Sequence, residues 1–168
     1  EALSDIITHL RKFMQKLFLT FFGFGLLPKA PGTWGSVAGA VAAYFVLYFF
    51  SATTLLLASI LLFLVSISVI DDFEKKVNSH DESFIVIDEV AGVWLAVAIS
   101  GATISQLVLS LVLFRVLDIK KPSIIGRIDR NVKGGLGVMG DDMVAGFFAG
   151  IISAMIYGIA MKFGVVLP

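Results

Sequence analysis

The sequence predicts an all-α fold: a polytopic membrane helical bundle with an N-terminal amphipathic helix, two helical hairpins and a final span. Two observations support this prediction. Hydrophobic residues make up 58% of the chain and the mean hydropathy is +0.95, more than a soluble domain of 168 residues normally carries. In addition, three segments contain no charged residue or histidine, and charge, glycine and proline gather between them. The charge-free segments are 37–70, 90–114 and 143–161, and the polar segments are 23–36, 71–89 and 115–142.

The composition also limits the classes of protein and site. A chain of 168 residues has room for one compact domain, so we expect a single membrane-embedded domain over 1–168. The formal net charge is zero, which gives no broad electrostatic surface for a nucleic-acid partner. Because the chain has no cysteine, disulfides and thiolate metal sites are excluded.

Residues 1–22 predict an amphipathic helix that lies in the membrane interface. Apolar side chains recur along one helical stripe, and the opposite stripe carries Arg11, Lys12 and Lys16. A cationic amphipathic helix of this kind binds in the headgroup region, with its apolar face toward the acyl chains. The alternative is a surface helix docked on the protein's own core.

Residues 37–70 predict the first hairpin, because this charge-free segment is too long for one span. Its polar break, 51–54, leaves arms that are short against the roughly 20 residues needed to cross a bilayer. Either the polar flanks extend these arms, or the hairpin does not cross fully.

Residues 90–117 predict a second hairpin with its break at 100–103, and 143–166 predict the final span. The first arm of the second hairpin is so short that partial insertion is an open alternative. The end of the final span is marked by Gly164 and Pro168.

Two hairpins that go out and back place all three polar segments on the same side of the membrane. Nine of the thirteen Lys and Arg residues lie in these segments, and three more lie on the N-terminal helix. Positively charged loops favour the cytoplasmic side, so the charged edge is predicted to face the cytoplasm.

The first polar segment suits a phosphate group. It leads into a helix for which Ser36 is a candidate N-cap, with Lys29 and Thr33 just before it. Exposed backbone amides at a helix start, beside a lysine and a hydroxyl, bind anions. A tight re-entry turn with Trp34 at the interface is the alternative.

The second polar segment contains two acids inside an apolar run, Asp88 and Glu89. Acids at the entrance of a membrane helix are costly unless a metal, a proton or a basic partner compensates them. We therefore expect a functional role for this pair, with structural salt bridging as the alternative.

The third polar segment combines acids, bases and glycines. Arg115 and Asp118 are three residues apart, which also allows a simple ion pair along a helix. Asp142 precedes the last span, where it has the alternative role of N-cap.

Carboxylates and cations thus converge on one face of the predicted bundle. Oxygen ligands without cysteine suit a hard cation such as Mg²⁺, and neighbouring lysines and arginines suit a phosphate. The residues therefore favour Mg²⁺-dependent phosphate chemistry at a membrane surface. A small transporter or channel and a non-catalytic membrane scaffold are the alternatives. A transporter predicts charges near mid-helix, whereas these charges gather at one membrane edge.

Four motifs in register, spread over about residues 20–150, resemble the bacterial phosphatidylglycerophosphatase A family. The motifs are Pro28-Lys29-Ala30-Pro31-Gly32-Thr33-Trp34-Gly35-Ser36; Ile85-Val86-Ile87-Asp88-Glu89 with Gly92 and Trp94; Phe114-Arg115 with Asp118 and Lys121-Pro122; and Asp129-Arg130 with Gly134-Gly135-Leu136-Gly137-Val138-Met139 and Asp141-Asp142.

The resemblance implies a Mg²⁺-dependent phosphatase of phospholipid biosynthesis in the bacterial cytoplasmic membrane, with its active site facing the cytoplasm. It would convert phosphatidylglycerophosphate, its phospholipid substrate, into phosphatidylglycerol and inorganic phosphate. Membrane lipids are the other expected partners, and a homo-oligomer is compatible with the sequence.

The resemblance also implies roles for individual residues. The candidate catalytic acids are Asp88, Glu89, Asp118, Asp141 and Asp142. The candidate metal ligands are Asp81, Asp88, Glu89, Asp129, Asp141 and Asp142. The candidate phosphate contacts are Lys29, Thr33, Arg115, Lys121 and Arg130.

We expect four of these acids to bind one or two Mg²⁺ ions while the basic residues hold the phosphate. The four are Asp88, Glu89, Asp141 and Asp142. An activated water then attacks phosphorus, and a covalent aspartyl-phosphate route is the alternative.

Overall fold

The computed structural model describes residues 2–78, 82–165 and 168. Within these residues the chain forms seven α-helices and one short 3-10 helix, η1. In chain order they are α1 (Ala2–Leu19), η1 (Phe24–Leu26), α2 (Pro31–Phe49), α3 (Ala52–Val77), α4 (Ile87–Ser100), α5 (Ile104–Lys120), α6 (Ile124–Asn131) and α7 (Gly134–Lys162). The predicted all-α fold class is confirmed. Three helices, α2, α3 and α7, are long and apolar enough to cross a membrane.

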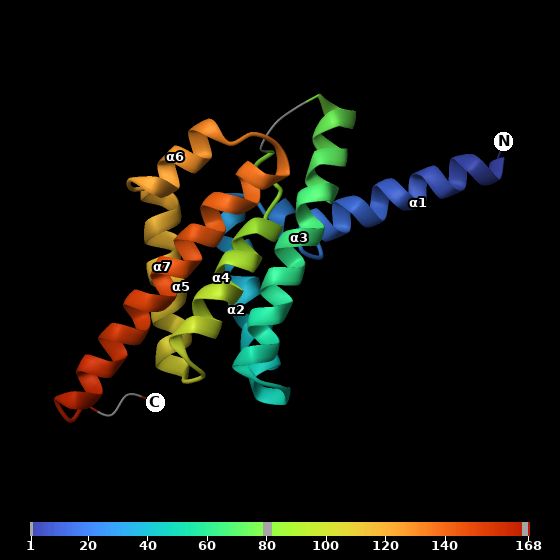
Figure 1. The fold of residues 1–168 in the computed structure, drawn as a ribbon. Coiled ribbons are helices and arrows are strands. Elements are labelled where there is room, and N and C mark those ends of the chain that lie inside the picture. Colours follow the sequence, from blue (N-terminus) through green and yellow to red (C-terminus); the bar gives the residue numbers. More distant parts are fainter. Residues whose placement is uncertain (1, 79–81, 166–167) are drawn as a thin grey trace.

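The bundle has two distinct ends (Figure 1). One end contains α6, the beginning of α7 and the last turns of α3. These parts belong to the polar segments 71–89 and 115–142. The other end holds the α2–α3 turn, the α4–α5 turn and the C-terminus. The polar segments that are far apart in the sequence therefore meet at one edge of the bundle.

Helix α4 is the centre of the bundle and packs against α2, α3, α5 and α7. Apart from Asp88, its buried side chains are small or β-branched, which lets the surrounding helices approach closely. Two hydrogen bonds from side chains to backbone carbonyls also join α4 to neighbouring helices. Ser59 of α3 donates to the carbonyl of Ala91 at 2.8 Å, and Trp94 donates to the carbonyl of Gly39 in α2 at 2.9 Å.

The first hairpin consists of helices longer than the two predicted arms. Its turn lies at Phe50 and Ser51, and the Ser51 hydroxyl caps α3 by accepting from the backbone N–H of Thr54 at 3.2 Å. The polar flanks extend both arms, to 19 residues in α2 and 26 in α3. The helix lengths agree with the first alternative for 37–70, in which the polar flanks extend the arms.

The second hairpin is shorter, with 14 residues in α4 and 17 in α5. At about 1.5 Å per residue, α4 is shorter than the roughly 30 Å hydrocarbon core of a bilayer. The turn is fixed by a capping box in which Thr103 and Gln106 bond reciprocally. Beside it, the Ser100 and Ser153 hydroxyls are 2.6 Å apart and join α4 to α7.

The last polar segment is more helical than its glycine content suggests. Residues 124–131 form α6, which is anchored in the core by buried Ile125. Helix α7 begins at Gly134, nine residues before the predicted start of the span at 143.

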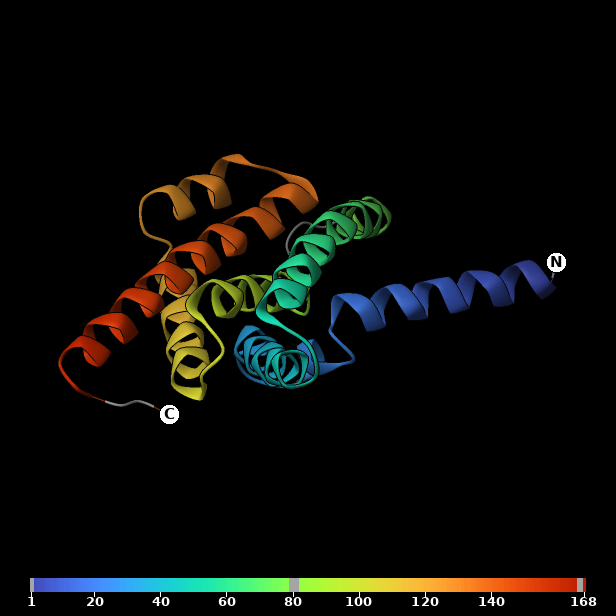
Figure 2. The ribbon, with the colours of Figure 1, turned by 60° about the horizontal axis from the view of Figure 1, so that its bottom comes forward.

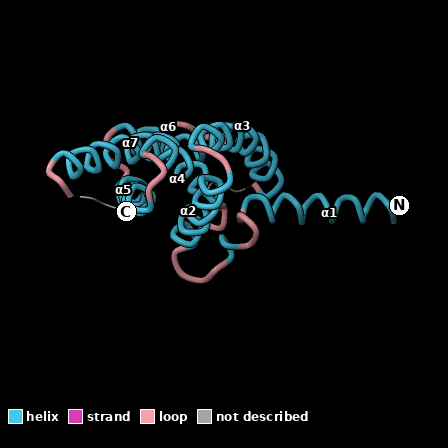
Figure 3. The backbone as a smooth tube through the Cα atoms, turned by 90° about the horizontal axis from the view of Figure 1, so that it is seen from below, coloured by secondary structure: helices cyan, strands magenta, loops and turns pink. Residues whose placement is uncertain are grey.

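Helix α1 extends away from the bundle and runs across the direction of α3 (Figures 1 and 2). Seen from below, most of its length has no other helix beside it (Figure 3). Its apolar stripe is exposed over most of its length, with Ile6, Leu10 and Phe13 each more than half exposed. The exposed apolar stripe is compatible with a helix that lies in the membrane interface. The interfacial location of α1 stays a prediction.

Candidate metal and phosphate site

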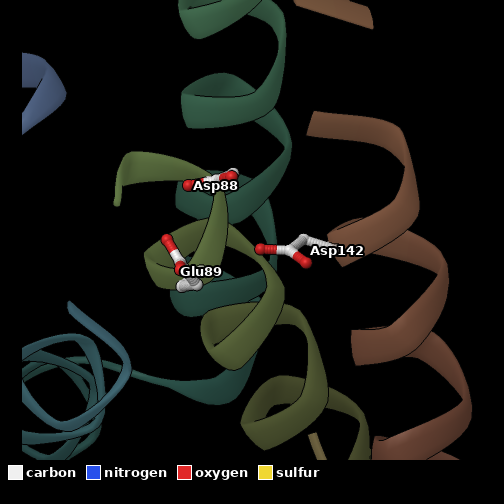
Figure 4. A group of neighbouring side chains, drawn as sticks. All are labelled: Asp88, Glu89 and Asp142. Atoms are coloured by element: carbon white, nitrogen blue, oxygen red, sulfur yellow. The ribbon is translucent and has the colours of Figure 1, made fainter. Parts of the chain in front are cut away.

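The charged edge of the bundle contains a buried group of three carboxylates, Asp88, Glu89 and Asp142. One oxygen from each lies within 4.8 Å of the other two. The first two project from the beginning of α4, and Asp142 reaches toward them from α7 (Figure 4). We call these three residues the acid triad.

Within the part of the chain that the structure describes, two oxygen atoms of the acid triad have no hydrogen-bond partner. Asp88 is 9% exposed, and its Oδ1 atom and the Oε2 atom of Glu89 are buried without a hydrogen bond. Buried carboxylates that lie together are costly unless a cation or protons compensate their charge. Three convergent carboxylates, in a chain without cysteine, are the donor set that hard divalent cations prefer. The triad therefore fits a metal ion.

The N-terminal end of α4 is held in place by backbone contacts with α1 and α2. The backbone N–H of Val86, just before α4, donates to the carbonyl of Leu19 at 2.9 Å. Gly35 of α2 lies against the same residue, since a Cβ there would come within 2.5 Å of Val86 Cβ. These contacts fix the position of the first turn of α4, which carries Asp88 and Glu89.

Asp142 takes its position from the third turn of α7. The alternative that Asp142 caps the last helix is wrong, because the helix begins at Gly134 and Asp142 lies inside it. The capping role belongs to Asp71 of α3, whose Oδ1 accepts from the backbone N–H of Gly135 at 2.6 Å.

Arg115 of α5 borders the acid triad. Its guanidinium bonds to Asp118, lies 3.9 Å from Glu89 Oε1 and donates to the Thr33 hydroxyl at 3.4 Å. The ion pair expected from the spacing of Arg115 and Asp118 is present. Gly32 makes room for the group, because a Cβ there would overlap the Glu89 carboxylate.

Lys121 lies on the other side of the site and joins two acids. Its ammonium donates to Asp141 Oδ2 at 2.8 Å and to Asp129 of α6. Burial disfavours the charged form of this lysine, but the two hydrogen bonds outweigh burial and raise its pKa above the ordinary value. Lys121 is therefore a cation held between α6 and α7.

One cavity of about 160 Å³ unites these groups. Its lining includes the acid triad together with Asp118, Lys121, Asp129 and Asp141. Seven of the predicted site residues thus come together at one place, and Arg115 and Thr33 stand beside them through the contacts above.

Two further predicted site residues neither line this cavity nor have a contact given above, and a third is outside the described residues. Lys29 and Arg130 are exposed and do not line it, so their phosphate contacts remain predictions. Asp81 lies outside the residues that the structure describes. Ser36 is not the N-cap of α2, since the helix begins at Pro31 and the Ser36 hydroxyl donates to the carbonyl of Gly32 at 2.7 Å.

Sequence reasoning missed some of the cavity wall. Glu82 and Ser83 line it, and neither is among the predicted site residues. Gly137 also lines it and belongs to the glycine run of α7. The glycine run indicates that other parts of the chain approach the α7 backbone closely, but the sequence does not tell which residues approach it.

The fold and the site together define a helical membrane protein with buried acids and fixed cations at one membrane edge, which is an arrangement suited to phosphate chemistry. A sequence model of the family described as phosphatidylglycerophosphatase A matches residues 17–157. The chain belongs to this family and is a phosphatase. The alternatives of a transporter, a channel and a non-catalytic scaffold are set aside by this result.

Individual relatives agree with this assignment. The chain is 38% identical over 133 residues to phosphatidylglycerophosphatase A of Escherichia coli, covering 78% of this chain and 77% of the relative. The corresponding protein of Haemophilus influenzae is 35% identical over 132 residues, 78% of this chain and 81% of the relative. A putative phosphatidylinositol-3-phosphatase of Bacteroides thetaiotaomicron is 34% identical over 149 residues, 85% of this chain and 93% of the relative. No solved structure matched the chain.

Proposed function

We propose that this phosphatase hydrolyses phosphatidylglycerophosphate to phosphatidylglycerol and inorganic phosphate, with Mg²⁺ as its cofactor. The observation that carries the proposal is the buried acid triad with unpaired oxygens, in one small cavity with Lys121. Two relatives named phosphatidylglycerophosphatase A support the choice of substrate.

The location of the cavity suits a lipid monophosphate. The site lies at the charged edge of a bundle whose outer surface is covered by exposed apolar side chains. The acyl chains of the substrate can remain in the bilayer while the phosphate enters the cavity. A soluble phosphate ester lacks this anchoring and is expected to be a poor substrate.

The residues of the cavity have distinct roles in the proposed reaction. Mg²⁺, when bound by the acid triad, neutralises charge on the phosphoryl group and lowers the pKa of water. Lys121 and Arg115 place positive charge beside the transferring phosphoryl group. Water oxygen forms the new bond to phosphorus, the ester P–O bond breaks, and the glycerol oxygen leaves with a proton.

A covalent route is the alternative chemistry. A carboxylate such as Asp118 would attack phosphorus and form an aspartyl phosphate before water releases the phosphate. Hydroxylamine traps an aspartyl phosphate as a stable hydroxamate on the protein. Direct attack by water leaves no hydroxamate at any time in a single turnover.

We also propose that the charged edge faces the cytoplasm of a bacterium. The concentration of Lys and Arg in the segments at this edge supports the orientation. Because the chain has no cysteine, single cysteines report sidedness directly. Lys133→Cys is expected to react only with reagent on the cytoplasmic side, and Thr53→Cys only from the opposite side. The reverse labelling pattern would overturn the orientation.

A panel of lipid substrates tests the proposed activity. Purified protein in mixed micelles is expected to release phosphate from phosphatidylglycerophosphate with Mg²⁺ and to lose this activity in excess chelator. Phosphatidylinositol 3-phosphate is the second candidate substrate, favoured by the Bacteroides relative. Faster release from the inositol lipid would replace the first proposal with the second, and release from neither lipid would contradict both.

A further inference from the structure

Six of the acids that line the cavity divide into two groups according to their partners. Asp118 is paired with Arg115, and Asp129 and Asp141 are paired with Lys121. Among the residues that the structure describes, the buried carboxylate oxygens without a hydrogen-bond partner belong to Asp88 and Glu89 of the acid triad. The protein's own cations therefore bond directly to Asp118, Asp129 and Asp141, whereas Arg115 reaches the acid triad only at 3.9 Å from Glu89 Oε1. The three carboxylates of the triad still need a cation.

Lys121 is held by the backbone as well as by its ammonium. It ends α5 in the left-handed region, with φ of 43°, which turns the chain back toward α6. Its carbonyl oxygen packs against Gly126 so closely that a Cβ on that glycine would come within 2.5 Å. The lysine is thus fixed at both ends, and its ammonium lies against Asp141, which is 4% exposed.

An ammonium in this position disfavours a metal ion at the same two acids. A divalent cation bound by Asp129 and Asp141 would have to displace Lys121 or lie beside a positive charge at short range in a buried site. Enzymes that use two metals for phosphoryl transfer place two cations about 3.5–4 Å apart, around the attacking and leaving oxygens. Here Lys121 shares the cavity with one candidate group of metal ligands among the described residues.

We propose that the site holds one divalent ion, at Asp88, Glu89 and Asp142, and that the ammonium of Lys121 takes the place of a second metal. The proposal rests on the proposed function, and it assigns Asp129 and Asp141 to the lysine instead of to a metal. Lys121 would then stabilise phosphate charge from a fixed position, and the acids around it would keep it there.

Counting bound Mn²⁺ tests the proposal without reference to activity. Equilibrium binding and electron paramagnetic resonance on the full chain in detergent are expected to give one ion per chain, with no spin coupling between ions. In Lys121→Gln the vacated acids should take up a second ion, so that the count rises to two and a coupled dinuclear signal appears. Lys120→Gln is the matched control, because Lys120 is exposed and does not line the cavity; it should keep one ion.

A second variant checks which acids receive the additional ion. Lys121→Gln combined with Asp129→Asn removes one ligand from the vacated position, so the count should return to one. Size-exclusion elution and the thermal transition show that each variant is folded, and the count in the unaltered protein is a test in itself.

Each outcome has a definite meaning. Two ions in the unaltered protein would overturn this inference and leave the proposed function intact. One ion in both the unaltered protein and Lys121→Gln would also overturn it, since the ammonium would not be standing in for a metal. No bound ion in the unaltered protein would instead contradict the metal centre of the proposed function.

Discussion

Gly146 of α7 lies directly against the backbone carbonyl of Gly92 in α4, and a Cβ on Gly146 would overlap that carbonyl. The two helices enter the bundle from the same end (Figure 1). Asp142 precedes Gly146 by four residues, and Asp88 precedes Gly92 by four, which is about one helical turn in each case. The glycine contact therefore sets the separation of the two helices immediately below the acid triad.

Gly146→Ala is expected to push α4 and α7 apart and to disturb the acid triad. Overpacking of this kind typically costs about 1–3 kcal/mol. We expect a lower thermal transition in detergent together with weaker Mn²⁺ binding. Gly158→Ala is the matched control on the same helix, because nothing lies within 4 Å of a Cβ at that position. Equal behaviour of the two variants would contradict the role of the glycine contact.

Asp71→Ala is expected to destabilise the protein without changing its chemistry. The carboxylate caps α7 through the backbone N–H of Gly135, and loss of a cap costs about 0.5–2 kcal/mol. The thermal transition should fall, while the number of bound metal ions should stay the same. Asp72→Ala is the control, since Asp72 is exposed and its ion pair with Arg11 is long, at 3.6 Å. A change in metal count in Asp71→Ala would show that this residue belongs to the site.

Arg115→Lys is expected to lower kcat/KM by about 10–100-fold, the range seen when groups that orient metal ligands are changed. The guanidinium reaches Asp118, Glu89 and Thr33 together, and a single ammonium cannot reproduce this geometry. Steady-state kinetics with micellar lipid substrate measure the effect. Arg127→Lys, on the exposed side of α6, is the control. Unchanged kinetics in Arg115→Lys would remove Arg115 from the site.

The interfacial position of α1 can be tested with two single cysteines. Leu10→Cys and Lys12→Cys lie on opposite faces of the helix, and both positions are exposed in the protein itself. In bilayers, a polarity-sensitive label at position 10 should report an apolar environment and a label at position 12 should report water. A polar environment at both positions would show that α1 stands clear of the membrane.

The membrane bundle was predictable because charged side chains are costly in lipid, so that membrane helices appear in the sequence as charge-free segments. The charge-free segments located α2, α3 and the apolar part of α7, and the stripe of α1 was visible at helical spacing. The acids Asp88 and Glu89 stood out because charged side chains are expensive beside apolar runs.

Other features depended on contacts between distant segments. The early start of α7 was hidden because glycines are poor helix formers; here Asp71 supplies the cap, and Gly135 packs against the backbone of Ile67. The link from Lys121 to Asp129 and Asp141 joins the end of α5 to two further helices. No local pattern in the sequence could specify that pairing.

The acid triad is expected to bind the metal on which lipid phosphate hydrolysis depends. The most direct test measures phosphate release from phosphatidylglycerophosphate across a Mg²⁺ titration, for unaltered protein, Asp88→Asn and Asp142→Asn, with Asp72→Asn as an exposed control. We expect Mg²⁺-dependent release from the unaltered protein and the control. The two triad variants should lose more than about 100-fold of that activity, since even changes to groups behind metal ligands cost 10–100-fold. Full Mg²⁺-dependent activity in folded Asp88→Asn or Asp142→Asn would contradict the account.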